Sequence, residues 1–162
     1  MTYPPEVYRG DSGLLNAWLR PTGSAPELDL AAGGRCHYLA TGDQTGGNFG
    51  LYRWEMGPAV GGPTPHFHKT ITESFYVLDG EVEFFQGEQW VVGHAGDFVH
   101  VPEGGIHGFR NVAPEPASML ILFTPGAPRE DYFETLIDKA KTDAMSAEDW
   151  TAFFLRHDTY WT

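Results

Sequence analysis

Three histidines and one glutamate have the types and the spacing to hold a metal ion together. His66 and His68 form an H-x-H pair, and alternate residues of a strand point to the same face, so the two imidazoles are predicted to ligate one ion. Glu73 follows with the opposite parity, so residues 69–72 must turn or bulge to bring its carboxylate onto that face. His107, from a distant strand, would complete the set when a barrel closes.

This ligand set predicts a catalytic rather than a structural ion. Three neutral imidazoles and one carboxylate leave a divalent ion with a net charge of about +1, and octahedral coordination keeps positions open for water, substrate or dioxygen. We therefore expect one divalent transition metal. Imidazole nitrogen suits several of them, so the sequence leaves iron, nickel, cobalt, manganese, copper and zinc open.

The elements that must position these residues are short β-strands. Between residues 36 and 125, short apolar runs alternate with turn residues, and Asp79-Gly80 is a strong hairpin signal between two of them. Many short strands at close spacing are typical of a sandwich or a barrel. We therefore predict an all-β fold with its barrel at 36–125, preceded by an N-terminal arm at 1–35 that packs on the barrel.

A helical extension is expected at 126–162. Apolar residues recur at helical spacing within 129–141, which predicts a first helix. Ser146 followed by Asp149 is typical of a helix start, and Trp150, Phe153 and Phe154 then follow at helical spacing. We expect two short amphipathic C-terminal helices that lean on the barrel.

Composition argues against several classes of function. The 162 residues carry a formal net charge of −12, so neither nucleic acid nor an acidic membrane surface is an expected partner. No apolar run reaches the length of a membrane-spanning helix, and the first residues lack the features of a signal peptide. The one cysteine, Cys36, excludes an internal disulfide framework. We expect a cytoplasmic protein whose partner is a small-molecule substrate.

The spacing around the four ligands resembles the two signature motifs of the cupin superfamily. The motifs read His66-x-His68-x4-Glu73-x6-Gly80 and Gly96-x5-Pro102-x-Gly104-x2-His107-x3-Asn111. The second matches at every position, whereas the leading glycine of the first falls at Val60, just before glycines at 61 and 62. The resemblance implies a double-stranded β-helix, which is the jelly-roll barrel of cupins, with one metal held by these four residues.

Strand parity predicts which other side chains face the ligands. Phe75 shares the face of Glu73, and Phe109 shares that of His107. In the strand at 51–56, the sequence leaves open which of the two faces turns inward. The candidate substrate-binding residues are Phe75, Phe109, Tyr52 and Trp54.

The order of parts is similar to that of bacterial single-domain quercetinases, the flavonol 2,4-dioxygenases. These also follow the second motif with an apolar strand, a Pro-Gly turn and an acidic-aromatic helix, found here at 124–133. The resemblance implies that Glu73 doubles as the catalytic base, which takes a proton from the substrate hydroxyl. The favoured function is a metal-dependent dioxygenase acting on an aromatic or enolic substrate of the flavonol type.

Two other functions stay open. Cupins also include cyclases, isomerases and decarboxylases, in which the ion acts as a Lewis acid, and non-catalytic modules that bind a small molecule.

Barrels of this family often pair by their sheets, and an aromatic N-terminal segment with Tyr3, Tyr8 and Trp18 needs a surface to cover. We therefore expect a homodimer.

Overall fold

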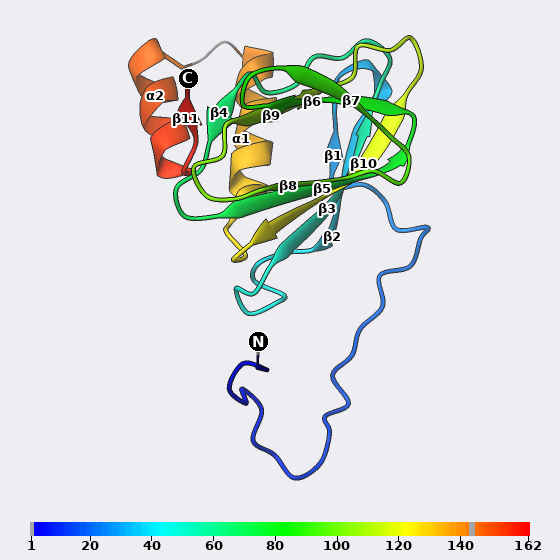
Figure 1. Cartoon of the computed structure of the whole chain (residues 1–162), viewed down its shortest axis with the longest axis vertical. Coiled ribbons are helices and arrows are strands. Elements are labelled where there is room, and N and C mark those ends of the chain that lie inside the picture. Colours follow the sequence, from blue (N-terminus) through cyan, green and yellow to red (C-terminus); the bar gives the residue numbers. More distant parts are fainter. Residues whose placement is uncertain (1, 143–144) are drawn as a thin grey trace.

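Two antiparallel sheets face each other across an aromatic core in the computed structural model, which describes residues 2–142 and 145–162 (Figure 1). The first sheet has the order β1 (Leu28–Asp29), β2 (Arg35–Ala40), β3 (Gly50–Met56), β10 (Ala117–Thr124), β5 (Thr72–Asp79), β8 (Phe98–Val101). The second has the order β11 (Tyr160–Trp161), β4 (His66–Phe67), β9 (His107–Arg110), β6 (Glu81–Gln86), β7 (Trp90–His94). The all-β, double-stranded β-helix prediction is confirmed.

Strand β10 aligns the elements that carry the site. Its residues alternate between buried and half-buried, as expected for a strand with one face on a core. It pairs with β3 on one side and with β5 on the other, and this register sets Phe123 directly opposite Glu73. On β3, Tyr52 and Met56 are buried, so the face that also carries Trp54 turns inward.

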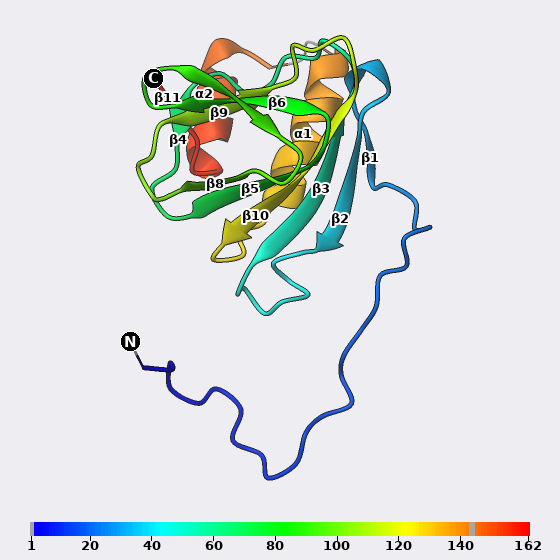
Figure 2. The same cartoon turned by 45° about the vertical axis from the view of Figure 1, so that its right-hand side comes forward.

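The N-terminal arm lies away from the barrel rather than on it (Figure 2). Every residue from 2 to 19 is exposed. The arm joins the fold near its end. There Arg20 forms an ion pair with Glu27, and the next residues, Leu28–Asp29, pair with β2. The expected packing of the whole arm at 1–35 is therefore not observed within this chain, because apolar residues alone do not specify which surface will cover them.

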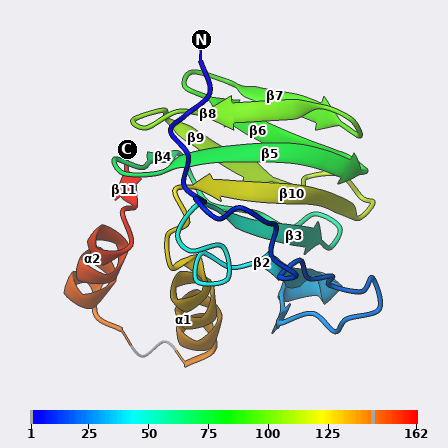
Figure 3. The same cartoon turned by 90° about the horizontal axis from the view of Figure 1, so that it is seen from below.

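The C-terminal extension contains helix α1 (Arg129–Thr142) and helix α2 (Ala147–Arg156), as predicted. Ser146 begins α2 with a capping box: its hydroxyl accepts from the Asp149 amide, and the Asp149 carboxylate accepts from the Ser146 amide. The chain then returns as β11, which pairs with β4, so the extension also completes the second sheet (Figure 3). No helix of the described residues is both long and apolar enough to cross a membrane.

Candidate metal centre

The four predicted ligands converge inside the barrel. His66 lies in β4, His68 just after it, Glu73 in β5 and His107 in β9. Their donor atoms all lie within 4.8 Å of one another, and all four side chains are buried. Nitrogen and oxygen ligands each lie about 2.0–2.2 Å from a bound ion, so opposite ligands are about 4 Å apart. The cluster therefore has the size of a single ion site.

Strand pairing and one tight bend create this convergence. His66 and His107 form a direct cross-strand pair between β4 and β9, with ring centroids 4.3 Å apart. The chain bends at Lys69 and Thr70, as the parity of Glu73 required. The carboxylate of Asp158 accepts hydrogen bonds from the amides of both bend residues, at 3.0 and 2.8 Å. The predicted turn is thus held by a residue from the far end of the chain.

Backbone carbonyls orient all three imidazoles. Each Nδ1 lies within hydrogen-bond distance of a carbonyl oxygen, which only accepts, so Nδ1 carries the proton and Nε2 of the neutral ring keeps a lone pair. The Nε2 atoms of His107 and His68 lie 2.8 and 3.3 Å from Oε2 of Glu73. Lone pairs that face a carboxylate need a proton or a metal ion between them, and a set of imidazole nitrogens around one carboxylate fits a metal ion. The accepting carbonyls belong to Thr64, Asp158 and Gly105.

The charges of the cluster suit metal binding at neutral pH. Burial, followed by the nearby His107, lowers the pKa of His66 from 6.5 to about 4, so this imidazole is neutral. Burial alone would raise the pKa of Glu73, but the close approach of the His107 and His68 imidazoles to its carboxylate outweighs burial and holds this pKa well below its usual range. Burial lowers and Glu73 raises the pKa of His107, with a net increase. Glu73 is therefore the one anionic ligand.

Motif residues outside the ligand set support the backbone around it. Gly104 has a φ of 79° and donates its amide to the carbonyl of His68 at 2.7 Å. At Gly62, a Cβ atom would lie 1.9 Å from the carbonyl oxygen of Phe109, so this position, rather than Val60, is where the chain requires a glycine. Asn111 is fully buried and donates to two backbone carbonyls, which makes its role structural.

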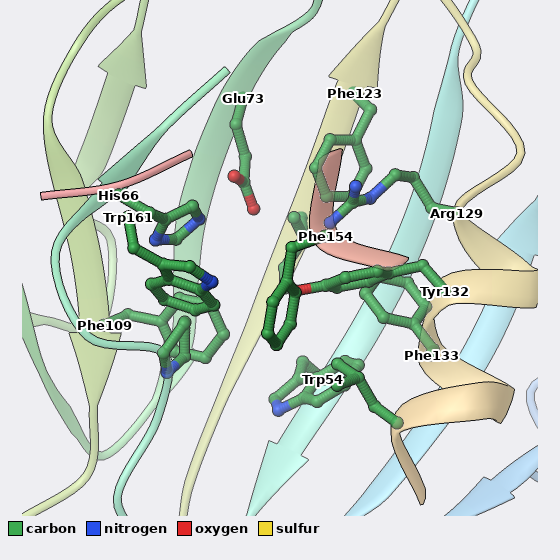
Figure 4. A pocket seen from close by; sticks show the side chains of 13 residues that line it. Trp54, His66, Glu73, Phe109, Phe123, Arg129, Tyr132, Phe133, Phe154 and Trp161 are labelled. Atoms are coloured by element: carbon green, nitrogen blue, oxygen red, sulfur yellow. The ribbon is translucent and has the colours of Figure 1, made fainter. Parts of the chain in front are cut away.

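A cavity of about 240 Å³ opens beside the ligands (Figure 4). Glu73 and His66 belong both to the metal cluster and to the cavity wall. The rest of the wall is mainly aromatic and aliphatic, and Arg129 is its one basic side chain among the described residues. The lining residues are Trp54, Pro63, His66, Glu73, Phe109, Ile121, Phe123, Arg129, Tyr132, Phe133, Leu136, Phe154 and Trp161.

Two of the four candidate substrate-binding residues reach this cavity. Trp54 and Phe109 line it, whereas Tyr52 and Phe75 do not. Tyr52 is buried and donates its hydroxyl to Glu130, and Phe75 packs against Phe109 in the core. Parity placed Phe75 and Phe109 on the inward faces of their strands and left the face of β3 open. It carries no information on which position along a face borders a cavity.

The C-terminal extension supplies wall residues that the sequence interpretation did not assign to the site. Helix α1 contributes Arg129, Tyr132, Phe133 and Leu136, while α2 contributes Phe154. Trp161 in β11 lies with its ring centroid 5.2 Å from that of His66. The available signal was the helical spacing in 129–141, which indicated an apolar face that needed cover. It did not indicate that this face closes the barrel over a cavity.

Comparison with known families agrees with this architecture. The sequence profile of the Cupin domain family matches residues 52–123, a range that contains all four ligands. Residues 52–123 of this chain therefore form a cupin domain. Its buried His/His/Glu/His cluster is suited to binding a metal ion, and the cupin barrel explains why residues from three separate strand regions meet at one point.

One curated relative of this cupin is quercetin 2,3-dioxygenase from Bacillus subtilis (strain 168). The two are 33% identical over 129 residues, which cover 73% of this chain and 36% of the relative. The chain thus spans about a third of the length of that enzyme.

Solved structures share the fold at lower identity. A predicted oxalate decarboxylase from Thermotoga maritima superposes with a TM-score of 0.58 at 21% identity, covering 67% of this chain and 99% of that one. The structure of KdgF from Halomonas sp. gives a TM-score of 0.54 at 19% identity, covering 64% of this chain and 88% of that one. At these identities the likeness establishes the cupin barrel alone.

Proposed function

We propose that this cupin is a metal-dependent dioxygenase that acts on a flat aromatic or enolic substrate of the flavonol type. The observation that carries the proposal is that Glu73 belongs to the ligand cluster and also lines the cavity. A substrate in the cavity would therefore meet the metal and the carboxylate together. The similarity to the Bacillus subtilis quercetin 2,3-dioxygenase supports the substrate class.

Glu73 is placed to move a proton. Its Oε2 faces His107 and His68, which leaves Oε1 to accept the proton of a substrate hydroxyl in the cavity. Figure 4 shows the carboxylate pointing into the space between the aromatic side chains. A general base must lie within hydrogen-bond reach of the proton it takes, and the place of Glu73 in the cavity wall supports this role. A divalent transition metal, when bound by the four side chains, would supply Lewis acidity and redox chemistry.

The aromatic wall suits a flat ring and excludes water. Trp54 lies between Phe133 and Phe109, with ring centroids 5.1 and 6.4 Å away, and all three rings border the cavity. Offset and edge contacts of this kind favour aromatic ligands over aliphatic ones of equal size. The same apolar enclosure limits the access of water to the reacting substrate.

Oxygen uptake with quercetin tests the proposal. The metal-loaded protein is expected to consume oxygen and flavonol together. Glu73→Gln, supplied with excess metal until its metal content matches the native protein, is expected to turn over at least ~10²-fold more slowly, which is the usual scale for loss of a general base. Asp79→Asn, at the exposed far end of the same strand, is the matched control and should keep native turnover.

Two results would contradict the proposal. Near-native turnover by metal-replete Glu73→Gln would leave Glu73 as a ligand only. Absence of oxygen uptake with flavonols in a fully metal-loaded protein would remove the dioxygenase assignment, and oxygen-independent turnover would indicate cyclase, isomerase or decarboxylase chemistry instead.

A further inference from the structure

Arg129 is a buried cation in the wall of the cavity. It is the first residue of α1 and is only 4% exposed. One of its terminal nitrogens, Nη1, donates to the carbonyl oxygen of His157 at 2.9 Å, which anchors the guanidinium at the end of α2. The guanidinium lies over the ring of Tyr132, 4.0 Å from its centroid, and 4.9 Å from the centroid of Phe123. Figure 4 shows it directed into the cavity from the side of α1.

The charge of Arg129 has no anionic partner among the side chains that the structure describes, which are those of residues 2–30, 32–138 and 145–162. None of the ion pairs between these residues includes it, and its Nε has no hydrogen-bond acceptor there. Arginine stays protonated in proteins, and an isolated buried charge is costly unless it is paired. The aromatic faces and the carbonyl of His157 offset part of that cost, but they do not replace an anionic oxygen acceptor.

Glu73 lines the same cavity and does not neutralise Arg129. No ion pair joins the two side chains, and Oε2 of Glu73 lies instead beside the imidazoles of His107 and His68. Two opposite charges thus border one apolar space without contacting each other. A ligand in this space would reach both charged side chains. It would place a hydroxyl at Glu73 and an anionic oxygen at Arg129.

We propose that Arg129 is a substrate-binding residue that receives an anionic oxygen group carried by an aromatic substrate. This inference rests on the proposed function, because it takes the cavity as the substrate site. It adds that the substrate carries two oxygen functions on one flat ring system: a hydroxyl that Glu73 deprotonates and a separate carboxylate, sulfonate or enolate-type oxygen. The planar fork of arginine is suited to such an oxygen group and would also fix the orientation of the ring.

Binding of two matched probes tests this role without any turnover. The protein is loaded with zinc, which is not redox-active, and titrated by calorimetry with naphthalene-2-sulfonate and with its neutral analogue 2-(methylsulfonyl)naphthalene. Both probes have the same ring system and differ in charge. Charge-assisted hydrogen bonds are stronger than neutral ones, so the native protein is expected to bind the sulfonate at least about 10-fold more tightly.

Substitutions then assign that preference to Arg129. Arg129→Gln is expected to abolish the preference while the neutral probe binds as before. Arg129→Lys keeps the charge but lacks the planar fork, and it should retain a several-fold preference. Arg110→Gln is the matched control, because Arg110 also lies over an aromatic ring, that of Trp90, but is paired with Glu83 and does not line the cavity.

Two outcomes would overturn the inference: an unchanged preference in Arg129→Gln, or an equal weakening of both probes, which would show that Arg129 only supports the fold. The outcomes also separate this inference from the proposed function. Oxygen uptake with flavonol but no charge preference would reject the role of Arg129 alone. A charge preference that Arg129→Gln abolishes, without oxygen uptake, would reject the dioxygenase assignment alone.

Discussion

His68 and Asp158 are 90 residues apart in the sequence, yet Nδ1 of the imidazole donates a hydrogen bond to the backbone carbonyl of Asp158. The carboxylate of the same aspartate caps the bend at Lys69 and Thr70 that precedes Glu73. The segment that follows α2 therefore positions one metal ligand directly and a second through the bend. It is part of the metal centre and not only a cover for the barrel.

Removing the carboxylate of Asp158 should weaken metal binding. Its φ of 53° favours glycine, so Asp158→Gly keeps the backbone conformation and loses only the side chain. We expect metal affinity, measured by competition with a chelator, to fall by about 10-fold, the lower end of what the loss of a hydrogen bond around a metal site costs, because the bend before Glu73 loses its support while the carbonyl that orients His68 remains. Asp79→Asn should leave it unchanged. Equal affinities of the Asp158→Gly variant and the native protein would contradict this role.

In the metal-free protein, His66 should make stability depend on pH. Its folded pKa of about 4 lies below the ordinary value of 6.5, because burial and His107 disfavour the cation. Between these values the unfolded chain binds a proton that the folded chain does not. The stabilising contribution is therefore fully present above about pH 6.5 and is lost as the pH falls towards 4, by up to about 3 kcal/mol.

Urea denaturation of the metal-free protein measures this effect. The loss of unfolding free energy between neutral pH and about pH 4.5 should be smaller in His66→Gln than in the native protein, because glutamine does not titrate. The comparison cancels the contributions of carboxylates that both proteins share. The same loss in both would show that His66 is not the group responsible.

Trp54 and Tyr52 share a face of β3, but only Trp54 borders the cavity. Trp54→Leu keeps an apolar side chain and removes the ring, so the KM for a flavonol should rise about 10-fold. Tyr52→Phe removes only the hydroxyl that donates to Glu130 and should leave KM unchanged. A similar rise in both variants would indicate a general disturbance of the core and not a contact with substrate.

We propose that the chain forms a homodimer in which the exposed arm covers a second copy. Tyr76 and Phe98 pair across β5 and β8 on the outer face of the first sheet, and Phe98 is 63% exposed. The arm carries further exposed apolar side chains. Light scattering at tens of micromolar should give twice the 18.0 kDa of one chain, and deletion of residues 2–19 should lower it. A monomer mass for the native chain would reject the dimer.

The ligands and the barrel could be predicted from the sequence because local rules determine them. Strand alternation sets His66 and His68 on one face, and the parity of Glu73 required the bend that the structure shows at Lys69 and Thr70. The capping box at Ser146 is also a local pattern, and the helix begins where it predicts.

The cavity wall depends on long-range packing and was not predictable in the same way. The helical spacing of α1 shows which residues are apolar, but not that Tyr132 and Phe133 line the same cavity as Glu73. Strand β11 is two residues long and exists only because β4 lies beside it. A charged residue such as Arg129 would ordinarily be assigned to the surface from sequence, and only the fold shows that it is buried.

Metal content combined with X-ray absorption spectroscopy tests the central claim most directly. The purified protein should bind one divalent transition metal per chain, with nitrogen and oxygen ligands at about 2.0–2.2 Å and an imidazole scattering pattern. His107→Ala should lose most of that metal, while His94→Ala, an exposed histidine outside the cluster, should keep it. A native protein that binds no metal under saturating conditions, or a His107→Ala variant that retains full occupancy, would contradict the account.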